Sequence, residues 1–432
     1  MEPIRLTDEK NVFSVRAEMS RHAEAVNRDV LRAVEPVVAD VRAHGDEAVR
    51  RYTKQFDGVE PAGFELSAQE LEAACAAAPE ELTRALQRAA ERIRAFHAHQ
   101  LQRSWMTESE DGTVLGQRVL PLEKVGVYVP GGSAAYPSSV LMNIIPAKLA
   151  GVKEIAVATP PFRSERGRLA VLAAAKIAGA DRVFTVGGAQ AIAALAYGTE
   201  SIPRVDKITG PGNAYVAAAK SMVYGQVDID MVAGPSEILI IADGTANPEY
   251  LAADMLSQAE HDVLASSVLL TTSETVARQT AAALERQTAM RSRRAMIGRS
   301  LADNGLIVVC ESLSSAAEIA NQIAPEHLEI MAENPMVLLP KIRNAGSVFL
   351  GAYSPEPLGD YMAGPNHVLP TGGTARFMSP LSVDSFIKKS SFIMATPELL
   401  RSLADDIVTL AENEGLDAHA AAVRIRQEIQ PK

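Results

Sequence analysis

The feature that most constrains the fold is an alternation of short apolar runs with helix-like segments, which begins near Val114. In the first series the apolar runs end in Gly or Pro, and they read VGVYVP, KEIAVATP, RVFTVGG and RVDKITGPG. Such an alternation is typical of a parallel β-sheet whose strands are joined by crossover helices. A second series starts at EILIIADG and continues through SSVLLTTS and NGLIVVC to SVFLG. We therefore predict an α/β fold with two Rossmann-like, doubly wound lobes.

Helical extensions are expected on both sides of the two lobes. The segment LSAQELEAACAAAPEELTRALQRAAERIRAFHAHQ has amphipathic spacing that is interrupted at Pro79, which predicts a pair of helices. The tail from Pro397 onward also has a helical pattern. The predicted organisation is a helical N-terminal region at 1–110, a first Rossmann-like lobe at 111–235, a second Rossmann-like lobe at 236–380, and a helical C-terminal tail at 381–432.

Composition excludes several classes of partner. The formal net charge of −11 argues against nucleic acid or an anionic membrane as the main partner. The start, MEPIRLTDEK, lacks the apolar core of a secretory signal, and no apolar run reaches the length of a membrane span. Two cysteines, Cys75 and Cys310, suit a reducing compartment and provide no disulfide framework. We expect a cytoplasmic protein.

An acid and an imidazole stand side by side in N-Q-I-A-P-E-H-L-E, at Glu326 and His327. Because proline suits the first position of a helix, Pro325 is expected to open a helix that holds both side chains in its first turn. The positive end of a helix dipole disfavours imidazolium, so His327 would be the neutral ring that a general base requires. Considered without its surroundings, the pair fits a capping acid beside a surface histidine better.

A metal site is one interpretation of the histidines and carboxylates in the later part of the chain. Gln258 and His261 in S-Q-A-E-H-D are three residues apart and so share a helix face. Asp360 lies in a long Gly- and Pro-rich loop at 352–380, and loops of that length are usually functional or disordered. Catalytic zinc takes His and carboxylate ligands and leaves room for a substrate. Residue types alone leave the metal open, since Mn or Co suits the same ligands.

Three glycine-containing turns suggest a cofactor site in the first lobe. G-P-G-N at 210–213 follows an apolar run and opens a helix, so its backbone N–H groups could hold a phosphate. V-Y-V-P-G-G at 127–132 and G-G-A-Q at 187–190 end two other predicted strands. Ligands bind at the carboxyl ends of strands in open α/β sheets. The dinucleotide fingerprint G-x-G-x-x-G is absent, and each turn by itself also fits an ordinary tight turn.

Together these motifs resemble those of the histidinol dehydrogenase family. I-D-M-V-A-G-P-S-E-I-L-I-I-A-D at Ile229–Asp243 is similar to the long diagnostic segment of that family. Y-V-P-G-G, T-G-P-G-N, S-Q-A-E-H-D, A-P-E-H-L and G-D-Y-x-A-G-P-N-H-x-L-P-T occur in the family's order. The resemblance covers essentially the whole chain and includes E-x-x-x-x-H at Glu414 and His419 in the tail.

The resemblance implies a zinc-dependent, NAD-linked, four-electron oxidation of L-histidinol to L-histidine through bound L-histidinal, the last two steps of histidine biosynthesis. It implies a homodimer with one zinc ion per subunit, in which the C-terminal tail of each subunit completes the site of its partner. Glu326 and His327 match the family's acid–base pair. The implied zinc ligands are Gln258, His261, Asp360 and His419; these four are also implied substrate contacts, with Ser236, His327, His367 and Glu414, and the implied NAD contacts are Tyr128, Gln190 and Asn213.

Three alternatives have different requirements. A same-scaffold NAD dehydrogenase of another small alcohol, such as a sulfonated diol, would not need groups that recognise an imidazole and an amine, so Glu414 and His367 count against it. A dimeric NAD- or zinc-binding protein without catalysis would be expected to lack the Glu326–His327 pair. An aldehyde dehydrogenase that depends on Cys310 would need a reactive thiol, yet Cys310 ends an apolar run without a neighbouring histidine, which favours a buried structural thiol.

Overall fold

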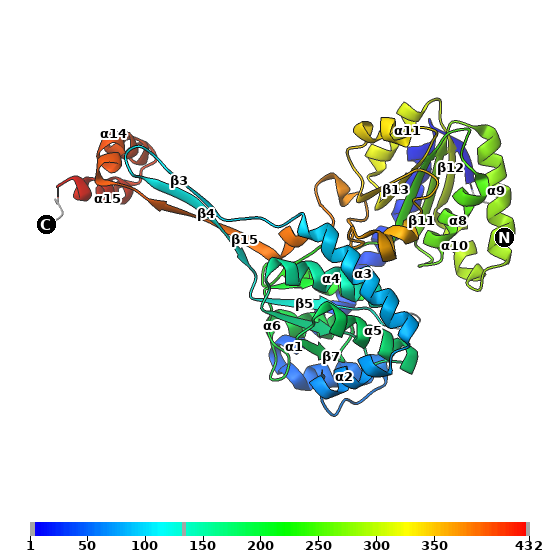
Figure 1. The fold of residues 1–432 in the computed structure, drawn as a ribbon, viewed down its shortest axis with the longest axis horizontal. Helices are drawn as coiled ribbons and strands as arrows, with labels where there is room; N and C mark the ends of the chain where they lie inside the picture. Colours follow the sequence, from blue (N-terminus) through cyan, green and yellow to red (C-terminus); the bar gives the residue numbers. More distant parts are fainter. Residues whose placement is uncertain (1–4, 132–134, 429–432) are drawn as a thin grey trace. The chain divides into compact units, whose positions relative to one another are not determined.

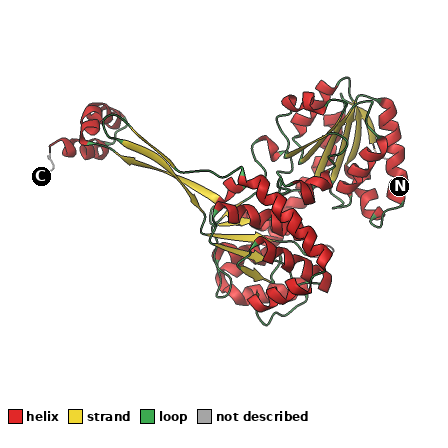
Figure 2. Cartoon of the chain, viewed as in Figure 1, coloured by secondary structure: helices red, strands yellow, loops and turns green. Residues whose placement is uncertain are grey.

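The computed structural model describes residues 5–131 and 135–428, with the backbone alone for residues 14–27 and 428. Contacts divide the chain into two units. The first comprises the residues up to Gln100 together with Leu122–Phe386, and the second comprises Leu101–Pro121 together with the residues from Ile387 onward. The first unit contains two six-stranded sheets, and the second contains a three-stranded sheet (Figures 1 and 2).

The first lobe is a sheet in the order β2-β7-β6-β5-β8-β9, in which every pair except β2–β7 is parallel. The chain runs outward from β5 through β6 to β7 and then returns to β8 on the other side of β5, so the sheet is doubly wound. Its strands are β2 (Glu65–Leu66), β5 (Lys124–Tyr128), β6 (Glu154–Ala158), β7 (Arg182–Phe184), β8 (Lys207–Thr209) and β9 (Asp228–Ile229).

Helices cover both faces of this sheet because successive side chains of a strand point to opposite faces. Val125 and Val127 pack with the helices of one face, whereas Tyr128 packs with the helices of the other. The first face is covered by α2 (Ala68–Ala77), α3 (Glu80–Ala98), α4 (Pro137–Ala150) and α5 (Glu165–Ala178), and the second by α1 (Val12–Asp57), α6 (Gly188–Tyr197) and α7 (Ala214–Val223). The predicted helix pair on either side of Pro79 is confirmed as α2 and α3.

The second lobe is an entirely parallel sheet in the order β1-β12-β11-β10-β13-β14. Its strand order again reverses beside the first strand of the series, here between β10 and β13, which confirms two doubly wound lobes. The strands are β1 (Arg5–Asp8), β10 (Glu237–Ala242), β11 (Ser266–Thr271), β12 (Gly305–Val309), β13 (His327–Met331) and β14 (Ser347–Leu350). The helices are α8 (Pro248–Ala259), α9 (Glu274–Ala289), α10 (Arg294–Asn304), α11 (Leu313–Ile323) and α12 (Pro335–Leu338), followed by the 3-10 turn η1 (Leu339–Lys341).

The prediction of a helix that begins at Pro325 is wrong. Helix α11 ends at Ile323, Ala324 adopts the left-handed conformation with φ 53°, and the chain enters β13 at His327. Every residue of β13 is buried, and the strand pairs with β10 on one side and β14 on the other. Pairing of this short segment on both sides, in the interior of a parallel sheet, thus outweighs the local helix-start signal of proline followed by an acid.

The long loop at 352–380 is ordered into short helical turns rather than left irregular. They are α13 (Glu356–Leu358), the π-helical turn η2 (Gly359–Ala363) and the 3-10 turn η3 (Thr374–Arg376), and a further 3-10 turn, η4 (Val383–Phe386), follows the loop. Two of these turns, α13 and η2, are continuous in sequence. They carry acidic side chains toward the second sheet.

The second unit combines an antiparallel sheet with the C-terminal helices. Its strands are β3 (Trp105–Glu108), β4 (Val114–Pro121) and β15 (Ile387–Met394), and its helices are α14 (Pro397–Asn413) and α15 (Asp417–Glu428). The helical pattern from Pro397 onward is confirmed, but the segment after residue 381 also contains β15, whose partner β4 lies far away in sequence. Within the described ranges, no helix is both long and apolar enough to cross a bilayer.

Candidate active site

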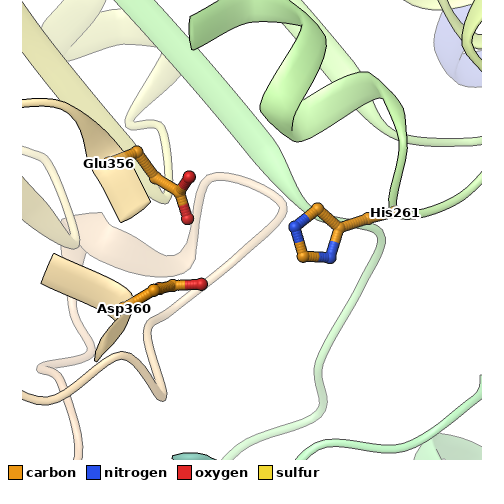
Figure 3. Close-up of side chains that lie close together, drawn as sticks. All are labelled: His261, Glu356 and Asp360. Atoms are coloured by element: carbon orange, nitrogen blue, oxygen red, sulfur yellow. The ribbon is translucent and has the colours of Figure 1, made fainter. Parts of the chain in front are cut away.

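The candidate active site lies at the amino ends of strands β10 and β13, which are neighbours at the point where the strand order of the second sheet reverses. Glu237 and His327 are the first residues of these two strands. Helix α8 returns from the carboxyl end of β10, so its last turn brings Gln258 to the same edge, with His261 just beyond it. The loop turns α13 and η2 supply the carboxylates of Glu356 and Asp360, which face His261 (Figure 3).

The predicted acid–base pair is fixed by the main chain of Glu237. The Glu237 N–H donates to Oε2 of Glu326 at 2.8 Å, and Nδ1 of His327 lies 3.0 Å from the carbonyl oxygen of Glu237. A carbonyl oxygen only accepts, so Nδ1 carries the hydrogen. The other ring nitrogen, Nε2, is buried and has no hydrogen-bond partner among the residues that the structure describes. His327 therefore presents Nε2 to the site.

The charge state expected for His327 is not the one that its surroundings favour. Burial opposes the charged ring, but the carboxylates of Glu326, Glu356 and Asp360 outweigh burial and raise the pKa of His327 to about 10. Two of these carboxylates lie 4.0 Å from Nε2, namely Oε1 of Glu356 and Oδ1 of Asp360. The helix-dipole argument for a neutral ring fails because His327 begins a strand. A cation bound by the same carboxylates would offset their effect on the ring.

Three side chains form a group that could hold a metal ion. His261, Glu356 and Asp360 each offer one ligand atom, and these atoms lie within 4.8 Å of one another (Figure 3). Gln258 lies three residues before His261, it is buried, and its Oε1 lacks a partner within the described part of the chain. An orphaned buried amide oxygen is unusual and calls for an explanation such as a bound ion. The donor set of imidazole, carboxylate and amide oxygens suits zinc.

Glu356 is the residue that the sequence analysis missed. Oε2 of Glu356 accepts a hydrogen bond from Ser257 Oγ at 3.3 Å, and the Glu356 main-chain N–H donates to Glu329 Oε1 at 2.8 Å. A signal was present in the sequence, since Glu356 and Asp360 are four residues apart and consecutive helical turns would place both on one face. The surrounding proline and glycine residues in P-E-P-L-G-D obscured that pattern.

His367 lies against Asp360, and both of its ring nitrogens have hydrogen-bond partners within the protein. Nδ1 lies 3.1 Å from the main-chain oxygen of Asp360, and Nε2 lies 3.2 Å from Oγ of Ser139 in α4. Burial lowers the pKa of His367, although the Asp360 carboxylate opposes this, so the ring is neutral near pH 7. A cavity of about 250 Å³ adjoins His327, Asp360 and His367, and its other walls include the apolar side chains of Val348, Phe349 and Leu350.

The remaining predicted substrate residues are not brought together in the same way. Ser236 is half-buried and directly precedes Glu237, so it belongs to the same edge of the sheet. Glu414 and His419 belong to the second unit, at the C-cap of α14 and within α15, and both are exposed. Their role in the site is still a prediction.

The glycine-containing turns of the first lobe follow the carboxyl ends of β5, β7 and β8, as predicted. Tyr128 ends β5; its hydroxyl accepts the Gly188 N–H at 3.1 Å, and burial raises the pKa of Tyr128 to about 12. Gln190 is fully buried, and neither its amide oxygen nor its amide nitrogen has a partner within the described ranges. Position 210 requires glycine, because its φ is 111° and a Cβ there would lie 2.0 Å from the main-chain oxygen of Tyr128.

Asn213 has a structural role that is visible in the fold. Its Oδ1 accepts the N–H groups of Tyr215 and Val216, each at 3.1 Å, and so caps helix α7. The cap fixes the helix N-terminus that follows the G-P-G-N turn. The final glycine of V-Y-V-P-G-G, Gly132, lies outside the described residues.

Two doubly wound lobes, one with glycine-containing turns at its carboxyl edge and one with a group of imidazole and carboxylate side chains, form an α/β scaffold with the features of an enzyme. The family model described as Histidinol dehydrogenase matches residues 20–427. The chain belongs to the histidinol dehydrogenase family.

Relatives with this family name resemble the chain over nearly its full length. The histidinol dehydrogenase of Syntrophotalea carbinolica is 55% identical over 92% of both chains, and that of Clostridium acetobutylicum is 52% identical over 93% of both chains. Among solved structures, the histidinol dehydrogenase of Elizabethkingia anophelis has a TM-score of 0.87 and 43% identity, and the match covers 92% of each chain. The similarity thus extends across both lobes and most of the second unit.

Proposed function

We propose that the protein catalyses the zinc-dependent, NAD-linked oxidation of L-histidinol to L-histidine through bound L-histidinal. Family membership supports this reaction, and one observation carries it: the free Nε2 of His327 faces the group of His261, Glu356 and Asp360. A base beside a cation site is the arrangement that oxidation of a chelating amino alcohol requires.

Zinc would be held by His261 and Asp360, with the orphaned Oε1 of Gln258 as a third ligand and His419 as the fourth. Glu356 lies close enough to replace one of them or to balance the charge of the ion. When bound, zinc would supply a template for the amine and imidazole nitrogens of histidinol and so orient the reacting carbon.

His327 would act as the general base. Its Nδ1–H is held by the Glu237 carbonyl, so Nε2 takes the hydroxyl proton while hydride passes to NAD. Glu326, 3.5 Å from Nδ1, would stabilise the imidazolium and assist the addition of water to the aldehyde. A second proton and hydride transfer from the hydrate gives the acid. Ser236, His367 and Glu414 are proposed as further substrate contacts, together with the residues that hold zinc.

NAD would bind at the carboxyl edge of the first sheet, with Tyr128, Gln190 and Asn213 as contacts. The buried amide of Gln190 supports this assignment because both of its polar atoms lack partners in the described part of the chain. The capped N-terminus of α7 supports it as well, since main-chain N–H groups at a helix start favour phosphate oxygens.

A direct assay tests the reaction. The zinc-loaded protein with L-histidinol and NAD is expected to form two NADH for each histidinol consumed. A zinc-loaded preparation that forms no NADH with histidinol would overturn the proposal. NADH formation with a sulfonated diol instead would establish the same-scaffold alternative.

We propose further that the protein is a homodimer in which the second unit of each subunit completes the site of its partner. Several large apolar side chains of this unit are exposed, which suits burial in an interface: Trp105, Met106, Ile393, Met394 and Leu410.

The two cysteines are free thiols, which favours the reducing cytoplasm as the location.

Mixing two inactive variants tests the shared site. If tails are exchanged, His261→Ala and His419→Ala subunits should together recover roughly a quarter of wild-type activity, because half of the randomly formed dimers would each have one intact site. If each tail completes the site of its own subunit, the mixture stays inactive.

A further inference from the structure

The loop segment that carries Asp360 and His367 is attached to the first lobe, although it follows the second lobe in sequence. The Nδ2 of Asn366 donates to the main-chain oxygen of Met142 in α4 at 2.7 Å, and its Oδ1 accepts the Val368 N–H at 2.9 Å. Gly364 packs against α3 so closely that a Cβ would lie 2.8 Å from the Arg92 oxygen. Both ends of the turn Gly364–His367 are therefore held by helices of the first lobe.

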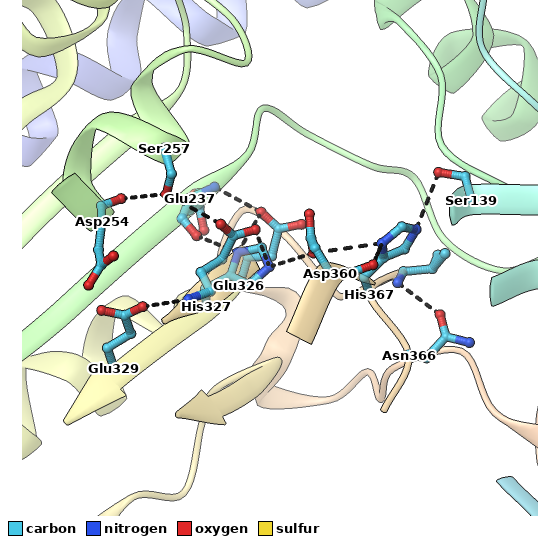
Figure 4. A network of polar contacts seen from close by, with 12 residues as sticks. Ser139, Glu237, Asp254, Ser257, Glu326, His327, Glu329, Asp360, Asn366 and His367 are labelled. Carbon is cyan, nitrogen blue, oxygen red and sulfur yellow. Dashed lines mark hydrogen bonds and ion pairs between the residues drawn. The ribbon is translucent and has the colours of Figure 1, made fainter. Parts of the chain in front are cut away.

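The second contact with α4 is the hydrogen bond between Ser139 and His367. Ser139 is buried, and it lies three residues before Met142, so both anchors are on one face of the helix. The main-chain oxygen of Asp360 can only accept, so Nδ1 of His367 is the protonated nitrogen of the neutral ring. Nε2 must then accept, and the Ser139 hydroxyl donates to it at 3.2 Å (Figure 4).

This arrangement leaves His367 without a free ring nitrogen that could bind the metal. Instead the ring forms a direct link from α4 to the main chain of Asp360, whose carboxylate belongs to the group that could hold a metal ion. Side chains that orient metal ligands through hydrogen bonds commonly affect metal affinity as strongly as some ligands do.

We propose that Ser139 is a positioning residue of the metal site, acting through His367 on Asp360. The inference rests on the proposed function, since it takes Asp360 to be a zinc ligand. Ser139 lies in the first turn of α4, the helix that follows β5 in sequence, and the same helix also holds the Asp360 segment. Without the Ser139 hydroxyl, the His367 ring loses one of the two hydrogen bonds that fix its orientation. The main chain of Asp360 is then held less firmly.

The test compares zinc binding by the full-length Ser139→Ala, Ser139→Thr and Ser138→Ala proteins with that of the wild type. Competition with a chromophoric chelator measures the zinc dissociation constant, and thermal unfolding of the zinc-free proteins is measured in parallel. Ser139→Ala is expected to bind zinc about tenfold or more weakly, in the range typical of groups that support metal ligands. Ser139→Thr keeps the donor and should restore most of the affinity, and the neighbouring, half-buried Ser138 serves as the matched control.

Steady-state kinetics provide a second readout. For Ser139→Ala we expect a lower kcat/KM for histidinol at limiting zinc and an unchanged KM for NAD. A residue with a merely structural role would lower the unfolding temperature of the zinc-free protein without changing zinc affinity.

Two results would overturn the inference. One is equal zinc affinity in Ser139→Ala and wild type, whatever their unfolding temperatures; the other is a Ser139→Thr protein as weak as Ser139→Ala. A wild-type protein that binds no zinc would overturn the proposed function and this inference together. Failure of the inference alone is recognised by a zinc-binding wild type and an unaffected Ser139→Ala.

Discussion

Glu356 donates its main-chain N–H to the carboxylate of Glu329 at 2.8 Å, and both side chains are buried at the edge of the site. The side chains of Asp254 and Glu329 share a hydrogen bond. Burial raises the pKa of Asp254 to about 6 and, helped by the Asp360 charge, raises that of Glu356 to about 8. Burial and the Asp254 charge also hold the pKa of Glu329 well above its ordinary value.

These raised pKa values predict how the stability of the zinc-free protein depends on pH. The folded protein keeps protons that the unfolded chain has lost, so the free energy of unfolding should fall as pH rises from about 4.5 to 8. Glu329→Gln removes one such group but keeps an oxygen for the Glu356 N–H. We expect it to stabilise the zinc-free protein at pH 8 by on the order of 1 kcal/mol, and by less at pH 5.

Denaturant unfolding of the zinc-free proteins at both pH values measures this effect. The exposed Glu333→Gln is the matched control and should follow the wild type. If the free energy of unfolding of Glu329→Gln varies with pH just as that of the wild type does, the raised pKa of Glu329 does not contribute to the pH dependence of stability.

His327 and Glu326 should affect the two oxidation steps differently. His327→Asn removes the base at Nε2 and is expected to slow histidinol oxidation by about 10²–10⁴-fold. Glu326→Gln should slow the oxidation of added histidinal more than that of histidinol. Single-turnover NADH formation from each substrate separates the steps, and His44→Asn on an exposed helix face serves as the control. A uniform loss in both steps for Glu326→Gln would contradict this division.

Gln258 and Glu356 are the two candidates for the third zinc ligand, after His261 and Asp360. Chelation should abolish NADH formation and added zinc should restore it. Because Oε1 of Gln258 is buried without a partner in the described residues, Gln258→Ala should weaken zinc binding by more than about tenfold. Glu356→Gln should weaken it less than Asp360→Asn does.

Zinc content after dialysis against a chelator decides between the two residues. Gln287→Ala is the control, since Gln287 is also a buried glutamine in the same lobe but bonds to Glu249. Full zinc retention in Gln258→Ala together with loss in Glu356→Gln would exchange the two assignments.

Cys310 should be dispensable for catalysis. The thiol is buried, and burial together with the nearby Glu9 charge raises its pKa to about 12, so almost no thiolate exists at pH 8. Iodoacetamide at pH 8 is expected to modify the half-buried Cys75 first, as peptide mass spectrometry would show. Cys310→Ala should keep a kcat close to that of the wild type; its inactivation would favour a thiohemiacetal mechanism instead.

Local patterns in the sequence were enough to predict the two doubly wound lobes and the identity of several site residues. Runs such as KEIAVATP and EILIIADG have the length and apolarity of strands buried on both faces, and the segments between them have helical spacing. Strand length, apolarity and helical spacing are each visible within a few residues of sequence. Strands that alternate with helices form a parallel sheet, because each helix connects two neighbouring strands by a crossover. His261, Glu326, His327 and Asp360 were found because their residue types and motif order are visible in the chain.

Tertiary structure alone decided where those residues meet and what surrounds them. Pro325 has a local helix-start signal, but pairing with β10 and β14 makes the following residues the strand β13. In that strand His327 is buried close to three carboxylates, which raise the pKa of its ring. The pairing of β15 with β4 and the link from Ser139 to His367 join positions hundreds of residues apart. Burial, sheet pairing and charge proximity depend on the folded chain as a whole, so no short stretch of sequence carries them.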